Sequence, residues 1–74
     1  MASYLIVSGT LTKANRINNS ASGNPTWALT LDPFGRTFQT DPDSMVGMEP
    51  WQDEVGNFLT LQTRNGRICR VIAR

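Results

Sequence analysis

The chain has 74 residues, no histidine, a single cysteine and a formal net charge of +1. A chain of this length forms one small domain, residues 1–74, of marginal stability. One cysteine excludes an internal disulfide, the lack of histidine excludes a Cys/His zinc site, and the near-neutral charge argues against a strongly electrostatic partner.

The first strand is expected over residues 3–14, which are rich in Val, Ile, Thr and Tyr. Alternation places Leu5, Val7 and Leu11 on one face, and Gly9 marks a bend in a long strand. Residues 1–7 contain no basic leader, and the apolar run at 4–7 is far too short to cross a membrane. We therefore expect a cytoplasmic protein without a membrane partner.

A polar connection over residues 18–25 leads into the second expected strand, residues 26–31. Period-two alternation puts Trp27, Leu29 and Leu31 on one face of that strand. The turn at residues 32–35 then leads into a third strand at 36–40, which forms a hairpin with the second.

Short helical turns are expected between the third and fourth strands. Asp41 is placed to cap a first turn and Gly47 to end it, while residues 49–54 repeat the pattern. Neither segment is long enough to be stable as an isolated helix.

The last third predicts a β-hairpin with strands at 55–63 and 67–74. A two-residue turn would place Leu61 opposite Arg70 and Arg64 opposite Arg67. A three-residue turn with Gly66 left-handed would instead pair Leu61 with Cys69, Leu59 with Val71 and Thr60 with Arg70. We expect the second register, because it separates apolar from charged residues with Arg70 facing outward.

Five strands with one short helical turn between the third and fourth predict an all-β protein. The order is that of a small OB-like barrel, and an SH3-like barrel is the alternative. The expected core consists of the apolar residues on one alternating face of each strand, namely Leu5, Val7, Leu11, Trp27, Leu29, Leu31, Phe38, Leu59, Leu61 and Val71.

Several short motifs resemble those of small orphan proteins from actinobacterial phages and prophages. They are Gly9-Thr10-Leu11, the segment Asn19-Ser20-x-x-Gly23-Asn24-Pro25, the pair Asp43-Ser44 and the closing Gly66-Arg67-Ile68. The resemblance implies a phage or prophage origin, hence the cytoplasm of a host cell, and carries no known activity. Trp51 departs from this pattern.

The sequence offers no catalytic constellation, and we expect no enzyme, cofactor or metal site. Without histidine, acid–base chemistry would fall mainly to carboxylates, five of which lie between residues 41 and 54. Their spacing fits neither a calcium loop nor a glycosidase pair, and helix capping and solvation account for them.

Two candidate binding sites remain, and they point to different partners. Met45, Met48 and Trp51 lie in an irregular segment, where they form either a lid on the core or a contact patch for a host or phage protein. The second candidate is basic and could bind single-stranded nucleic acid, with Trp27, Phe38 or Tyr4 as stacking residues. Its residues are Lys13, Arg16, Arg64, Arg67 and Arg70.

We expect a small non-enzymatic accessory protein that acts as a protein-binding module through Trp51 and the two methionines. The alternative is an OB-like protein that binds single-stranded nucleic acid. The oligomeric state is left open, as monomer or homo-oligomer.

Overall fold

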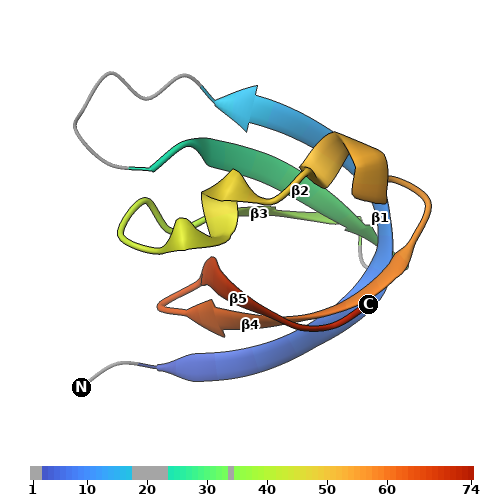
Figure 1. Cartoon of the computed structure of the whole chain (residues 1–74). Coiled ribbons are helices and arrows are strands. Elements are labelled where there is room, and N and C mark those ends of the chain that lie inside the picture. The colour runs from blue at the N-terminus through green and yellow to red at the C-terminus, as the bar shows by residue number, and fades with distance from the viewer. Residues whose placement is uncertain (1–2, 18–23, 34) are drawn as a thin grey trace.

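The computed structural model describes residues 3–17, 24–33 and 35–74, and every structural statement below concerns these residues. The all-β class is confirmed, with five strands and two single turns of 3-10 helix (Figure 1). The elements are β1 (Tyr4–Ile17), β2 (Thr26–Asp32), β3 (Arg36–Gln39), η1 (Met45–Met48), η2 (Trp51–Glu54), β4 (Phe58–Arg64) and β5 (Arg67–Ala73). The expected polar connection at 18–23 and Phe34 of the expected turn lie outside the described residues.

The strands form one antiparallel sheet in the order β3-β2-β1-β4-β5, with the long β1 at its centre. The first half of β1 pairs with β4 and the second half with β2, and Thr10 has a partner in both. Gly9 precedes this change of partner. A Cβ atom there would lie 2.3 Å from the carbonyl oxygen of Asp32, so a glycine is required for the end of β2 to approach β1.

The two outermost strands, β3 and β5, meet at a single parallel bridge between Thr40 and Ile68. The backbone N–H of Asp41 donates to the Ile68 carbonyl over 2.8 Å. At the next residue of β5, the side-chain hydroxyl of Ser44 donates a hydrogen bond to the Cys69 carbonyl over 2.7 Å, where a neighbouring strand would otherwise supply a backbone donor. The ladder of hydrogen bonds is therefore open, because β3 has only four residues with which to follow β5.

The segment between β3 and β4 contains two helical turns, and the second lies within residues 49–54, where the sequence indicated a further possible turn. Ser44 caps η1, since its side-chain oxygen accepts a hydrogen bond from the N–H of Val46. The predicted cap, Asp41, instead accepts a hydrogen bond from the N–H of Asp43 over 2.9 Å and stabilises the preceding turn. The segment packs over one side of the sheet (Figure 1).

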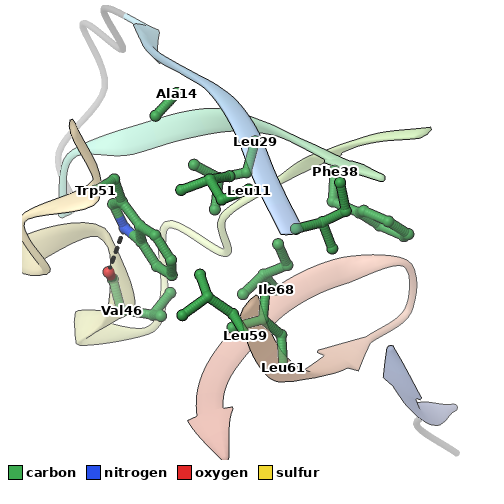
Figure 2. Packing of buried hydrophobic residues seen from close by; sticks show 10 residues of the cluster. Leu11, Ala14, Leu29, Phe38, Val46, Trp51, Leu59, Leu61 and Ile68 are labelled. Atoms are coloured by element: carbon green, nitrogen blue, oxygen red, sulfur yellow. Dashed lines mark hydrogen bonds between the residues drawn. The ribbon is translucent and has the colours of Figure 1, made fainter. Parts of the chain in front are cut away.

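The core lies between the curved sheet and the 3-10 turns (Figure 2). Six predicted core residues are buried, namely Leu11, Leu29, Leu31, Phe38, Leu59 and Leu61. Val7, Trp27 and Val71 are only half-buried against this cluster. The prediction was wrong for Leu5, which is 64% exposed near the beginning of β1. It also missed four buried hydrophobic residues, namely Ala14, Val46, Trp51 and Ile68.

The predicted register of the last hairpin was wrong. Asn65 and Gly66 form a two-residue turn, and extra residues in β5 then shift the pairing twice, between Gln62 and Thr63 and between Thr60 and Leu61. The left-handed conformation of Gly66 is confirmed, at a φ of +83°. The prediction assumed one unbroken register along the hairpin. Such a register cannot describe a bulge, because one extra residue changes the face that the following residues occupy. The observed pairs are Arg64–Arg67, Thr63–Ile68, Gln62–Arg70, Leu61–Val71 and Thr60–Ala73.

Candidate functional site: the outer face of the last hairpin

The turn of the β4–β5 hairpin brings two arginines directly opposite each other. Asn65 and Gly66 both have positive φ angles, 52° and 83°. Positive φ at both central residues is the geometry of the tight turn that Asn-Gly favours, because it matches the twist of the flanking strands. Arg64 and Arg67 are consequently cross-strand neighbours on the same face, and both are exposed.

Residues of three strands form two rows on this outer face. The row nearest the turn contains Tyr4, Arg64 and Arg67, and the next contains Ile6, Gln62 and Arg70. Partners within a row have Cβ atoms about 5 Å apart. We call the polar and aromatic part of these rows the arginine face. It consists of Tyr4, Gln62, Arg64, Arg67 and Arg70.

The charges of the arginine face are not neutralised by ion pairs within the described residues. Among the described residues, the only salt bridges join Arg74 to Glu49 and to Glu54, and Arg74 is not part of the arginine face. Asp41 and Asp43 line a cavity of about 340 Å³ together with Arg64 and Arg67, yet no carboxylate reaches ion-pair distance of either arginine. Like charges directly opposite each other destabilise a sheet, so this arrangement costs folding free energy.

Two predicted basic residues do not join the arginine face. Lys13 and Arg16 lie on the second half of β1, opposite Thr30 and Trp27 of β2. Asn24, just before β2, donates its backbone N–H to the carbonyl of Pro42 and its side-chain amide to the carbonyl of Ser44. The acidic segment around Asp41 and Asp43 therefore lies between the end of β1 and the hairpin turn (Figure 1). These carboxylates therefore separate Lys13 and Arg16 from the other three residues of the predicted basic site.

The candidate stacking residues differ in accessibility. Tyr4 is 55% exposed, whereas Phe38 is buried beneath the Arg36 guanidinium at 5.0 Å from its ring centroid. Trp27 is half-buried, and its indole N–H donates to the Gly47 carbonyl over 3.0 Å. Phe58, which is 61% exposed, was missed as a candidate. Successive side chains of a strand point to opposite faces, so Phe58 lies on the outer face if Leu59 and Leu61 face the core. The sequence alone could therefore have indicated it.

The predicted protein-binding residues are separated by the structure. Trp51 is fully buried and donates its indole N–H to the Val46 carbonyl over 2.9 Å (Figure 2). Of the two alternatives for Trp51, the lid on the core is the one that its burial supports. Met45 and Met48 are 73% and 61% exposed on either side of the buried pair Val46–Gly47. Only the methionines are accessible to a partner.

A second cavity, of about 330 Å³, lies between η1 and β5. Met45, Glu49, Cys69 and Arg70 are among its lining residues. Within the described part of the chain, no group of three acidic or cysteine side chains could hold a metal ion. No helix in that part is long and apolar enough to cross a membrane.

Comparison of the chain with known protein families, curated proteins and solved structures found no match.

Proposed function

We propose that this chain is a small OB-like protein that binds single-stranded nucleic acid through the arginine face. The OB-like assignment is supported by the central β1, which pairs with β2 and β4 in turn, and by the parallel contact of Thr40 with Ile68. In OB folds the hairpin between the last two strands borders the ligand. The closed barrel and the choice of OB-like over SH3-like topology belong to this proposal.

The observation that carries the proposal is the Arg64–Arg67 pair. Two arginines occupy directly opposite positions, with Arg70 in the next row, and no carboxylate of the described residues forms an ion pair with any of them. Sequences tend to break a local rule of sheet stability at functional sites. A phosphate backbone would relieve the repulsion, since arginine binds phosphate oxygens through two parallel hydrogen bonds.

Tyr4 supplies the second element that a single strand requires. Its ring is exposed in the same row as Arg64 and Arg67, so a base could stack on it while the flanking phosphates contact the guanidinium groups. Stacking on an aromatic side chain contributes about 1–3 kcal/mol per base and tolerates any sequence. Gln62 adds amide donors and acceptors beside Arg70.

The affinity should be modest and sensitive to salt. If the three arginines each contact one phosphate, log K should fall with log salt at a slope of about −2 for a single strand. The net charge of +1 and the neighbouring Asp41 and Asp43 argue for micromolar rather than tighter binding.

The test is fluorescence anisotropy with a labelled oligothymidylate of about 20 nucleotides, titrated at several salt concentrations. Arg64→Ser and Arg67→Ser should each weaken binding about tenfold and reduce the salt slope by about 0.7. Arg36→Ser is the matched control, because it removes the same charge from β3 and should change the affinity less than twofold. Equal losses in all three variants, or no binding at about 20 mM salt, would refute the proposal.

Protein binding through Met45 and Met48 is the second candidate function. Both side chains are mostly exposed although they flank a buried turn, and Met45 borders the cavity beside β5. Unbranched methionine side chains adapt to the shape of a partner. A pull-down from host lysate should yield a partner that the double variant Met45→Ser/Met48→Ser loses and Arg64→Ser retains; the reverse pattern would exclude the methionines.

A phage or prophage origin, a location in the host cytoplasm and a non-enzymatic accessory role complete the proposal. The origin is supported by the short motifs, of which Gly9-Thr10-Leu11, Asp43-Ser44 and Gly66-Arg67-Ile68 fall within described elements or their connections.

A further inference from the structure

The first half of β1 has a free edge. Residues 4–10 pair with β4 on one side, and β2 pairs only from Thr10 onward on the other. In Figure 1 this half of β1 forms the lower border of the molecule, with β4 above it. Along this border, the described part of the chain provides no strand for residues 4–9.

The backbone groups of Tyr4 and Ile6 point toward this free edge. The backbone groups of Ser3 face the β4–β5 hairpin. The Ser3 carbonyl accepts a hydrogen bond from the N–H of Asn65, and the Ser3 N–H donates to the Asn65 side chain. Backbone groups of successive residues in a strand point to alternate sides. Those of Ser3, Leu5 and Val7 therefore face β4, whereas those of Tyr4 and Ile6 are available to a further strand.

The free edge lacks the features that normally prevent strands from pairing between molecules. The stretch from Ser3 to Ser8 contains no charge and no proline, and Gly9 with its close approach to Asp32 lies beyond it. Edge strands are usually protected by lysine, proline, bulges or a covering loop. Here Tyr4, Leu5 and Ile6 are instead 55%, 64% and 56% exposed.

We infer that this edge pairs with the same edge of a second copy, antiparallel, about a two-fold axis at Leu5. In that register Tyr4 hydrogen-bonds with Ile6 of the second copy, and Ile6 with its Tyr4. The two Leu5 residues face each other at the axis as a non-hydrogen-bonded pair. The three exposed apolar side chains all lie within the overlap, and no charge enters it, so the stretch is complementary to itself.

The exposed area determines the strength of this dimer. Taking about 200 Å² for each fully exposed side chain, the three side chains offer roughly 350 Å² per protomer. Two copies then bury less than the roughly 1,200 Å² typical of a stable complex, even with some backbone added. The dimer is therefore reversible, with dissociation at micromolar concentrations. It goes beyond the proposed function and does not depend on it, and because the overlap covers Tyr4, dimer formation competes with base stacking on that residue.

Sedimentation velocity over about 5–500 μM provides the first test. The unmodified chain should shift from monomer to dimer across this range, and Leu5→Lys should remain monomeric, because two like charges would meet at the axis. Ile72→Lys is the matched control, since it replaces an exposed apolar residue of β5 and should dimerise normally. A monomeric unmodified chain at every concentration, or undiminished association of Leu5→Lys, would overturn the inference.

Disulfide trapping tests the register and does not rely on Leu5→Lys folding. In a Cys69→Ser background, Leu5→Cys should cross-link rapidly on mild oxidation, because residues in a non-hydrogen-bonded pair have Cα atoms about 4.5 Å apart, within the range of a disulfide. Val7→Cys should cross-link much more slowly, since Val7 would face Ser3 of the second copy. Equal rates for the two variants, or no cross-link at position 5, would contradict the proposed axis.

Discussion

The indole N–H of Trp51 donates a hydrogen bond to the carbonyl of Val46 over 2.9 Å, and both residues are buried. The bond joins the two 3-10 turns at one side of the core (Figure 2). It satisfies a polar group that would otherwise be costly to bury, and it positions the largest apolar side chain of the core.

Trp51→Ala should therefore destabilise the protein by about 3–5 kcal/mol, enough to unfold a domain of this size. Trp51→Phe should cost less, since it keeps most of the apolar volume and the Val46 carbonyl still accepts the N–H of Glu49. Trp27→Ala is the matched control, because it removes the same atoms and a similar hydrogen bond from a half-buried position. Urea denaturation measures all three. A larger loss for Trp27→Ala than for Trp51→Ala would show that the lid contributes little.

Gly66→Val should destabilise the hairpin by at least about 1–2 kcal/mol, because a β-branched residue is strained at the positive φ that the turn requires. Gly66→Asn should cost clearly less, since asparagine tolerates this conformation. Thermal unfolding followed by circular dichroism distinguishes the two variants. Similar melting temperatures for both would indicate that the turn rearranges without strain.

Arg67→Thr should stabilise the fold by about 0.2–1 kcal/mol, because it removes a like charge directly opposite Arg64 and introduces a good strand former. The gain should shrink at high salt, which screens the repulsion between exposed charges. Arg36→Thr should show no such gain, since Arg36 lies over the ring of Phe38. A loss of stability in Arg67→Thr would mean that the repulsion is already relieved, and would remove the main argument for an anionic ligand.

The pairing of Arg74 with Glu54 should make stability depend on acid pH. Arg74 donates to the Glu54 carboxylate over 2.6 Å and also pairs with Glu49, and its hydrogen bond holds the pKa of Glu54 below the ordinary 4.5. Because the pKa is lower in the folded state, the pair stabilises the fold above about pH 4.5. This contribution is lost as the pH falls further and Glu54 is protonated.

The measurement for this pair is the melting temperature between about pH 3 and pH 6. Arg74→Gln should flatten the acid side of the profile, and the change should be small because Arg74 is half exposed. Arg70→Gln is the control, since Arg70 forms no ion pair among the described residues. An identical profile for Arg74→Gln and the unmodified chain would show that the pair is not formed in solution.

The alternation of apolar and polar residues within each strand was sufficient to predict much of the fold. It predicted the five strands to within a few residues and the burial of Leu11, Leu29 and Leu61. These properties follow from the local geometry of a strand, in which successive side chains point to opposite faces. Helix capping signals likewise indicated turns near residues 44–54, although the capping residue is Ser44 and not Asp41.

Only the tertiary structure decided which of these faces are covered. The two-residue turn places Ile68 in the core and Arg64 opposite Arg67, and the bulge at Cys69 then pairs Arg70 with Gln62, because register depends on how β4 and β5 meet and not on either strand alone. Trp51 is buried because the 3-10 turns pack over the sheet, whereas Leu5 is exposed because neither β2 nor the turns extend over its end of β1. Burial is a property of contacts between segments distant in the chain, and a one-dimensional pattern does not contain them.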